Sequence, residues 1–350
     1  MVLDGCTEPV VLAPMAGGPS TPELAAAVSE AGGLGFLAAG YLTASQLADR
    51  LATTRHLTDR PFGVNLFLPG PPGVRGPLDR YARSVAADAA EVGAPLGDAH
   101  WEDDDIDGKL ALLLDDPPAV VSFTFGMPAA DLVRRLQVAG AEVWVTVTSV
   151  AGALDAVRVD ADALVVQGAE AGGHRGGVDD DPREAVGLLP LLQLVGTRVD
   201  LPLIATGGIA TGAGIAAVLV AGARAAALGT AFLDCPEAGT YAVHRAALRG
   251  GAPTALTRAF TGRTARGIVN DFLERHDAEA PAAYPEVHHL TAPLRAAARA
   301  AGRGDLVNLW VGQAYPLTRP LPAAELVREL GAQTRAALTR DLPLTTGTSS

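Results

Sequence analysis

The sequence predicts an α/β fold: a (β/α)8 TIM barrel with an inserted segment after the third strand and a C-terminal helical extension. Short apolar runs alternate with alanine- and leucine-rich stretches of helical periodicity, which is typical of parallel strands joined by crossover helices. Eight such units end near residue 250, the length expected of this barrel. A doubly wound open sheet would show the same alternation and is the alternative architecture.

The expected strands are continuous apolar runs, because helices cover a parallel sheet on both faces. We predict strands at 10–16, 34–40, 62–68, 119–126, 142–148, 163–168, 202–209 and 225–233. Helices are predicted at 22–31, 43–55, 128–139, 149–158, 184–196 and 211–221. The first helix has a clear start signal, since Ser20 or Thr21 precedes Pro22 and Glu23.

The chain is expected to form one domain, in which residues 1–250 make the barrel and residues 251–350 pack on it. The insertion occupies about residues 69–118, opens with the turn cluster PGPPGVRGP and predicts two helices around WEDDDID. This acidic run lacks calcium-loop spacing and is expected to be a solvated helix start. Segments inserted after barrel strands commonly shape the active site.

The charge of the chain argues against nucleic acid and membrane surfaces as partners. The formal net charge is −12, and Lys109 is the only lysine among 27 basic residues. The uncharged stretch 201–223 is long enough to span a bilayer. It contains Pro202 and the pair Gly207-Gly208, however, so a strand, a turn and a helix are expected instead.

Cysteine and histidine spacing predicts neither a disulfide framework nor a metal site. Cys6 and Cys235 lie far apart, which fits a reducing cytoplasm. The N-terminus MVLDGCTEPV has no basic region and no long apolar core, so no signal peptide is expected. His288 and His289 are adjacent and would point in different directions on a helix; we expect them to be surface or loop residues.

Glycines follow the seventh and eighth predicted strands, in ATGGIATGAG (205–214) and ALGTAF (227–232). In this barrel, the loops after these strands commonly bind phosphate through backbone N–H groups. The alternative is that the glycines only make tight turns. No G-x-G-x-x-G pattern follows the first strand, so a mononucleotide such as FMN is favoured over a dinucleotide.

The segment VVQGAEAGGHRGG (165–177) places His174 just beyond the sixth strand, on the face where this fold carries chemistry. Its glycines let the backbone approach a planar ring. Asn65 and Gln167 stand at strand ends, and their amides need partners, which a flavin edge or a neighbouring loop can supply. Either Glu170 or Arg175 could orient the loop by an ion pair, a role that we favour over a direct part in catalysis.

Together the segments VLAPMAGGPSTPELAAAVSEAGGLGFLAAG, PFGVNLF, VVQGAEAGGHRGG, PLIATGGIATGAGIAAVLVAGARAAALGTAFL and FTGRTARGIVNDF resemble the nitronate monooxygenase family. The resemblance covers nearly the whole chain, and Q-G-x-E-A-G-G-H is its most specific part. It implies an FMN-dependent barrel enzyme that oxidises alkyl nitronates, such as propionate 3-nitronate, with dioxygen to a carbonyl compound and nitrite.

The resemblance also implies residue roles, with His174 as the catalytic position. An imidazole there would take the α-proton of a neutral nitroalkane or hydrogen-bond the oxygens of a nitronate. The implied cofactor-binding residues are Met15, Asn65, Gln167, Gly172, Gly173, Gly208, Ala227, Leu228, Gly229 and Thr230. Trp310, Gly312 and Gln313 of the W-x-G-Q stretch, which approaches the flavin in this family, are secondary candidates. Arg263 and Arg266 either bind the substrate anion or anchor the C-terminal segment.

Two other functions stay open from the sequence. An NAD(P)H-dependent flavin reductase of the enoyl-ACP reductase or quinone reductase type shares the G-G-H loop. A non-enzymatic FMN-binding protein is the third possibility. The expected partners are a small nitronate and dioxygen, and the chain is expected to be a monomer or a homodimer.

Overall fold

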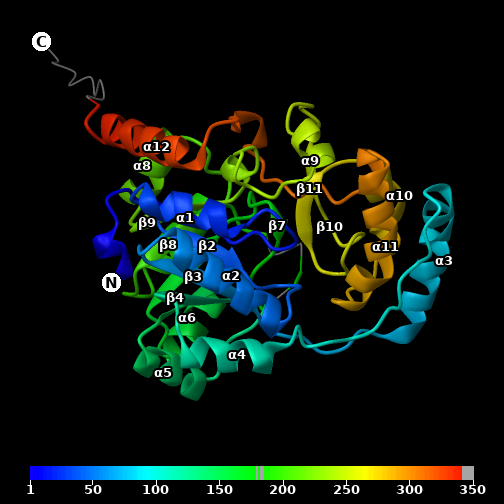
Figure 1. The fold of residues 1–350 in the computed structure, drawn as a ribbon, viewed down its shortest axis with the longest axis horizontal. Coiled ribbons are helices and arrows are strands. Elements are labelled where there is room, and N and C mark those ends of the chain that lie inside the picture. Colours follow the sequence, from blue (N-terminus) through cyan, green and yellow to red (C-terminus); the bar gives the residue numbers. More distant parts are fainter. Residues whose placement is uncertain (179, 182–184, 341–350) are drawn as a thin grey trace, which may run out of the picture.

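The computed structural model describes residues 1–178, 180–181 and 185–340. Eight parallel strands form one sheet in the order β1-β9-β8-β6-β5-β4-β3-β2. The two ends of this order meet, because Val11 of β1 bridges Leu34, next to β2, in parallel. The sheet therefore closes, which confirms the predicted TIM barrel; the open-sheet alternative is wrong (Figure 1).

Each barrel strand lies within its predicted run but ends earlier. The strands are β1 (Val10–Leu12), β2 (Gly35–Ala38), β3 (Phe62–Phe67), β4 (Val120–Thr124), β5 (Glu142–Val147), β6 (Ala163–Gln167), β8 (Leu203–Thr206) and β9 (Ala225–Leu228). The surplus apolar residues turn out of the sheet at its carboxyl edge. Ala13 and Met15, for example, leave β1 and line the cavity described below.

The predicted helices cover the outside of the barrel. They are α1 (Pro22–Glu30), α2 (Ala44–Leu57), α5 (Ala130–Ala139), α6 (Val150–Arg158), α7 (Leu188–Gly196) and α8 (Gly212–Val220). Thr21 caps α1 by accepting a hydrogen bond from the Leu24 amide, and Pro22 occupies the first turn. Residue 184, the first of one predicted helix, lies outside the described residues.

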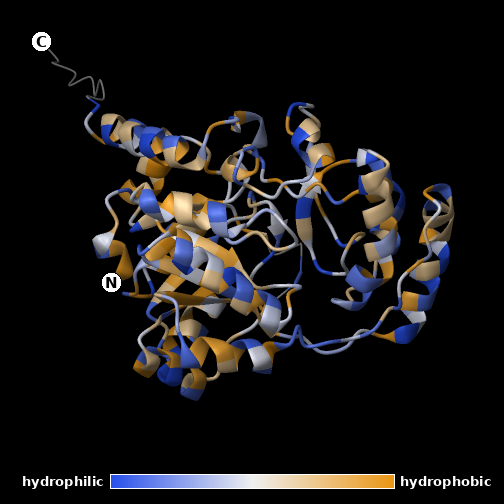
Figure 2. Ribbon diagram, viewed as in Figure 1, coloured by the Kyte–Doolittle hydropathy of each residue, from blue (hydrophilic) through white to orange (hydrophobic). Residues whose placement is uncertain are grey.

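Side chains of the strands alternate between two hydrophobic layers. Val10, Leu12 and Val64 face outward and pack against the helices, whereas Phe36 and Trp144 face inward, with ring centroids 5.7 Å apart. This period of two is what a closed barrel with a filled interior requires. Hydrophobic residues accordingly dominate the strands in Figure 2.

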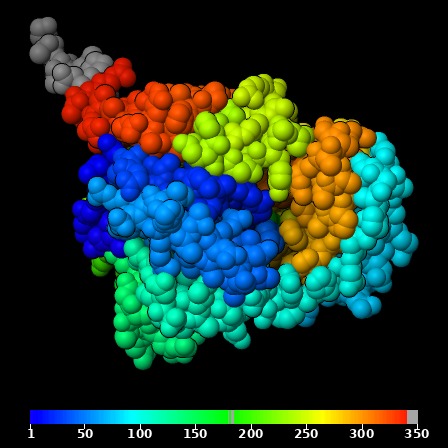
Figure 3. Space-filling view, viewed as in Figure 1, coloured from blue at the N-terminus to red at the C-terminus, as the bar shows by residue number. Residues whose placement is uncertain are grey.

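The insertion after β3 splits into two helices with different neighbours. The first is α3 (Arg75–Glu91), and the second is α4 (Ile106–Asp115), which packs against α2 and α5 on the barrel. By contrast, α3 packs beside two later helices, α10 (Asp271–His276) and α11 (Glu286–Ala300), on their side away from the barrel, as Figures 1 and 3 show. Two contacts secure it there: Tyr81 donates to the Ala259 carbonyl, and Asp88 lies 2.6 Å from His276.

The acidic run before α4 is only partly solvated, contrary to expectation. Asp104 lies 2.7 Å from the buried ammonium of Lys109 and accepts a hydrogen bond from the Tyr41 amide at 2.8 Å. Asp105 accepts from the Ala44 amide at 2.6 Å. Two of these carboxylates therefore attach α4 to the start of α2 rather than face water.

Beyond β9, the chain builds a second layer over the carboxyl ends of the strands. It contains α9 (Ala242–Ala247), α10 (Asp271–His276), α11 (Glu286–Ala300) and two antiparallel strands, β10 (Thr254–Thr257) and β11 (Ala265–Ile268). A third strand of this small sheet, β7 (Gly173–His174), comes from the loop after β6. With α3, these elements share a hydrophobic cluster of their own. The last described helix, α12 (Ala323–Leu338), returns to pack on α8.

None of the helices in the described part of the chain is long and apolar enough to cross a membrane. The uncharged stretch 201–223 forms β8, a turn and α8, as its proline and glycines predict.

Candidate active site

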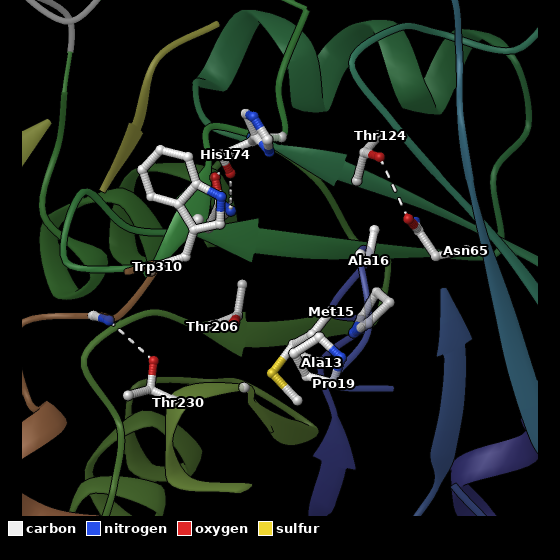
Figure 4. A pocket seen from close by; sticks show the side chains of 18 of the residues that line it. Ala13, Met15, Ala16, Pro19, Asn65, Thr124, His174, Thr206, Thr230 and Trp310 are labelled. Carbon is white, nitrogen blue, oxygen red and sulfur yellow. Dashed lines mark hydrogen bonds between the residues drawn. The ribbon is translucent and has the colours of Figure 1, made fainter. Parts of the chain in front are cut away.

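A cavity of about 390 Å³ lies at the carboxyl ends of the barrel strands, between the barrel and the second layer. This size falls in the range of small-molecule sites, and the position is where TIM barrels carry chemistry. In Figure 4, Met15 lies on one side of the cavity and His174 with Trp310 on the other.

The structure brings nearly all predicted site residues to this cavity. Its lining includes Met15, Asn65, Gln167, Gly172, Gly173, His174, Gly208, Ala227, Leu228, Gly229 and Thr230. Gln313 is the exception, because its side chain is exposed. Its backbone N–H donates to the Glu170 carbonyl at 3.0 Å. Trp310 and Gly312, the other two candidates of this stretch, line the cavity, as does Ala314.

His174 is enclosed by aromatic side chains. It stands on β7, and its ring centroid lies 5.6 Å from Phe125, 5.7 Å from Tyr284 and 5.6 Å from Trp310. The Nε2 atom lies 2.9 Å from the hydroxyl oxygen of Thr261. The ring therefore has a fixed orientation and one polar partner.

This enclosure determines the charge of His174. Burial, with smaller contributions from the positive charges of Arg263 and Arg295, lowers the pKa of His174 to about 3. The imidazole is consequently neutral at pH 7. A neutral imidazole can donate or accept a hydrogen bond, but it takes up a proton only weakly.

Gln167 and Asn65 are held by the protein itself. The Gln167 amide donates to the His174 carbonyl at 3.0 Å and accepts from the Gly176 amide at 2.9 Å, which fixes the loop that carries His174. Asn65 donates to the Ser122 hydroxyl at 3.0 Å. Both amides therefore have the neighbouring-loop or neighbouring-strand partners that the sequence left as an alternative, while they also line the cavity.

Glycines keep the backbone close to the cavity. Gly207 and Gly208 have φ of +121° and +68°, in the region that favours glycine, and they follow β8 directly. Gly173 has φ of +72°, and a Cβ atom added there would meet no atom within 4 Å. Gly172 is different, because a Cβ atom would lie 2.4 Å from the Gly312 amide nitrogen. The Gly172 contact thus joins the His174 loop to the C-terminal segment.

Glu170 and Arg175 shape the loop, as expected, but through backbone groups, since neither forms an ion pair with another described residue. Glu170 accepts from the amide of Leu188 at the start of α7, at 2.9 and 3.0 Å. Arg175 donates to the carbonyls of Gly168 at 2.7 Å and Gln167 at 3.3 Å. Each side chain satisfies backbone groups, a pairing that residue spacing in a loop does not reveal.

Arg263 and Arg266 anchor the second layer. Arg263 donates to the Arg175 carbonyl at 3.2 Å, and its guanidinium lies 4.2 Å from the centre of the Phe125 ring. Arg266 donates to the Ala169 carbonyl at 2.9 Å. Neither residue lines the cavity. The sequence left two roles open for these arginines, and their contacts favour anchoring of the C-terminal segment over substrate binding.

His288 and His289 lie in the first turn of α11 rather than in a loop, and they point in different directions as expected. The expectation of a surface position is wrong for His288, whereas His289 is partly exposed. His288 lines the cavity, and its ring stacks on Tyr41 with centroids 4.1 Å apart and planes 3° apart. Burial lowers the pKa of His288 well below its usual value, so this imidazole is also neutral. His289 points elsewhere, toward Glu102.

Arg295 is a cavity residue that the sequence did not single out. It is 5% exposed and donates to the hydroxyl of Thr291 at 2.9 Å, the side chain of Asn308 at 3.1 Å and the carbonyl of His288 at 2.9 Å. No acidic side chain in the described ranges forms an ion pair with it. Burial lowers its pKa to about 10, so Arg295 stays charged at pH 7.

The spacing between Arg295 and His288 in the sequence indicates that they share one face of α11. Arg295 lies seven residues, about two helical turns, after His288, so both face the same side of α11. The cavity therefore combines three neutral imidazoles, those of His174, His244 and His288, with two guanidinium groups. These belong to Arg295 and Arg299, and no carboxylate in the described part of the chain forms an ion pair with either. An uncompensated buried charge is costly, and an anionic ligand would offset that cost.

A closed (β/α)8 barrel with a glycine-edged cavity at the carboxyl ends of its strands is the architecture of a barrel enzyme. Comparison with known proteins gives its family. The family model described as nitronate monooxygenase matches residues 3–333, and the chain belongs to this family of flavin-dependent oxidoreductases. The protein is thus an oxidoreductase, and the non-enzymatic alternative is wrong.

Individual relatives agree with this assignment. The nitronate monooxygenase of Pseudomonas aeruginosa is 43% identical over 344 residues, which cover 95% of this chain and 97% of the relative. A crystal structure of nitroalkane oxidase from Streptomyces ansochromogenes is 50% identical, with a TM-score of 0.94, and covers 96% of this chain and 98% of that one. The structure of FabK from Thermotoga maritima is 27% identical, with a TM-score of 0.76 and coverage of 96% and 95%.

Proposed function

We propose that this enzyme uses FMN and dioxygen to oxidise alkyl nitronates, such as propionate 3-nitronate, to carbonyl compounds and nitrite. Two nitronates and one dioxygen give two carbonyl compounds and two nitrite ions, so each carbonyl carbon gains one oxygen atom. The observation that carries the proposal is the charge pattern of the cavity. The neutral imidazoles of His174, His244 and His288 accompany two guanidinium groups, Arg295 and Arg299, for which the described residues provide no ion-pair partner. This pattern suits a substrate that arrives as an anion.

The residues at the cavity fit FMN. Backbone amides at Gly208, Gly229 and Thr230 would hold the phosphate, where glycine leaves room for an anion against the main chain. Met15 and Gly173 would lie beside the flavin ring, with Asn65 and Gln167 at its polar edge. Bound FMN supplies the capacity to accept electrons from the substrate, which no side chain of the protein provides.

His174 is proposed to hold the nitronate group by a hydrogen bond. An efficient general base has a pKa near the working pH, and the pKa of about 3 for His174 is far below it. Removal of a proton from a neutral nitroalkane is therefore a poor task for this imidazole. A nitronate has already lost that proton, and an oxygen atom of the nitronate can accept a hydrogen bond from the neutral ring.

Oxygen consumption tests the proposed function. Purified enzyme loaded with FMN, supplied with propionate 3-nitronate in air, should consume dioxygen and release nitrite. His174→Asn should keep its yellow flavin but lose turnover. Enzyme that retains flavin but neither consumes oxygen nor releases nitrite would contradict the proposed function.

A second candidate is an NAD(P)H-dependent flavin reductase, which the similarity to FabK supports. A nicotinamide would stack on the flavin and needs no separate binding motif in the sequence. Anaerobic mixing separates the two functions. Bleaching of the flavin by the nitronate and not by NADH selects the oxidation of nitronates, and the opposite result selects the reductase.

We also propose that the enzyme works in the cytoplasm as a monomer or a homodimer. Cys6 and Cys235 are both free thiols, as a reducing compartment would keep them. Sedimentation at micromolar concentration would distinguish the two oligomeric states.

A further inference from the structure

Three side chains that commonly bind metals meet outside the cavity. His100 and Glu102 lie in the irregular segment between α3 and α4, and His289 lies in the first turn of α11. Their ligand atoms are all within 4.8 Å of one another. Across residues 1–178, 180–181 and 185–340, this is the one such group of three or more. Sequence spacing could not predict it, because the two segments are distant along the chain.

His289 provides the best-placed ligand atom. Its Nε2 is shielded from solvent and lies 3.1 Å from a carboxylate oxygen of Glu102, yet it forms no hydrogen bond of regular geometry within the described part of the chain. Its ring stacks on His100 with centroids 4.1 Å apart and planes 18° apart.

His100 is oriented as metal-binding histidines usually are. Its Nδ1 lies 3.0 Å from the Asp98 carbonyl oxygen and must donate to it, which leaves the lone pair of Nε2 free. The segment is fixed close by, because the Gly97 amide donates to the Leu290 carbonyl at 2.9 Å. A Cβ atom at position 97 would lie 2.1 Å from the His289 carbonyl oxygen, so glycine permits this approach.

We propose that His100, Glu102 and His289 bind one divalent first-row transition-metal ion, for which Zn²⁺ is the natural probe. Two imidazoles and one carboxylate form a known zinc donor set that leaves a position for water. Magnesium and calcium prefer ligand sets made only of oxygen atoms. With tetrahedral bonds of about 2.0–2.1 Å, ligand atoms lie roughly 3.4 Å apart, so closure by up to about 1.4 Å is needed. Because an imidazole binds a metal in its ring plane, the His100 ring must also rotate out of its stack on His289. The exposed His100 side chain can supply this movement.

The ion would link the insertion to α11 one residue away from His288, which lines the cavity. Bound metal should therefore stabilise the second layer, because an ion bound by the folded chain would hold the insertion against α11. Such a site would be separate from the flavin chemistry, since none of its three ligands lines the cavity.

Equilibrium dialysis of the untagged full-length enzyme against Zn²⁺ tests the proposal. We expect one saturable ion per chain and an increase in the melting temperature. His100→Ala and Glu102→Gln should each weaken binding at least tenfold and abolish the increase. The matched control His56→Ala removes an exposed histidine of α2 and should bind as the natural chain does. No saturable binding, unchanged binding in His100→Ala, or loss of binding only in Cys6→Ser would overturn the proposal.

Discussion

The Nε2 atom of His174 lies 2.9 Å from the hydroxyl oxygen of Thr261, which makes this threonine the polar partner of the proposed substrate-binding imidazole. Thr261 is 1% exposed, and its hydroxyl oxygen lies 3.3 Å from the Arg263 carbonyl oxygen. When the single hydroxyl proton is donated to Nε2 rather than to this carbonyl, the N–H of the neutral His174 ring is on Nδ1 and can be donated to a substrate oxygen. The orientation of His174 thus depends on a residue of the second layer, far along the chain from the barrel loop that carries the histidine.

Thr261→Val should therefore reduce turnover of a nitronate without removing the flavin. Loss of the hydroxyl leaves Nε2 without its partner, and a lost hydrogen bond of about 1.4 kcal/mol corresponds to a tenfold fall in kcat/KM. Steady-state kinetics with a flavin spectrum of the same sample would measure both effects. Thr261→Ser keeps the hydroxyl and should recover most of the activity; equal rates in all three enzymes would rule out this positioning role.

Arg295→Met should make the ligand-free protein more stable and the enzyme less active. The substitution removes a buried charge that no carboxylate in the described part of the chain balances, and apolar replacements of buried charges often stabilise. The same charge is proposed to attract the anionic substrate, so KM should rise roughly tenfold or more while kcat changes less.

Thermal unfolding and kinetics on one preparation would test both halves of the Arg295 prediction. Arg328→Met, which removes an exposed arginine of α12, provides the control and should leave stability and KM nearly unchanged. If Arg295→Met left KM unchanged, Arg295 would have no part in binding the substrate.

Gly172→Ala should loosen the contact between the His174 loop and the C-terminal segment. The added Cβ atom would lie 2.4 Å from the Gly312 amide nitrogen, where backbone atoms must move to accommodate it. Overpacking of this kind typically costs about 1–3 kcal/mol. A lower melting temperature and weaker flavin retention are expected, whereas Gly5→Ala, where a Cβ atom meets nothing within 4 Å, should have little effect.

The unfolding free energy should fall as the pH decreases below about 6.5, because several histidines are buried in the neutral form. Burial lowers the pKa of His174 to about 3, that of His244 to about 4 and that of His288 well below its usual value. Between these values and 6.5, the unfolded chain binds more protons than the folded one, so stability increases with pH across this window.

Each buried histidine contributes at most about 1.4 kcal/mol per pH unit to this slope. His288→Gln should thus flatten the dependence of the urea midpoint on pH between pH 6 and 4.5, compared with His56→Gln on the surface. Identical slopes in the two variants would show that His288 is accessible to protons in the folded state.

The barrel could be predicted because its signals are local. Apolar runs, helix starts such as Thr21-Pro22 and glycines after the last two strands each report their own segment. The same holds for Gly208 and His174, which line the cavity because they follow strands whose ends share one edge of the barrel. Their roles toward substrate and cofactor remain predictions.

What the sequence did not reveal depends on contacts between distant segments. Arg295 and His288 reach the cavity because α11 packs across the barrel mouth, and Glu170 bonds to the start of α7 rather than to Arg175. Gln313 shows the finer limit. Its motif identified the right segment, and the candidates Trp310 and Gly312 do line the cavity, but the turn there leaves the Gln313 side chain exposed.

The division of the insertion between two layers has a consequence for biosynthesis. Helix α3 finds its partners in α10 and α11, which are synthesised almost 200 residues later. A growing chain that has completed α3 must therefore leave its apolar face, with Leu78 and Tyr81, uncovered until nearly the whole protein has left the ribosome. Truncation after residue 250 would make that exposure permanent, so the barrel should aggregate when produced without its C-terminal segment.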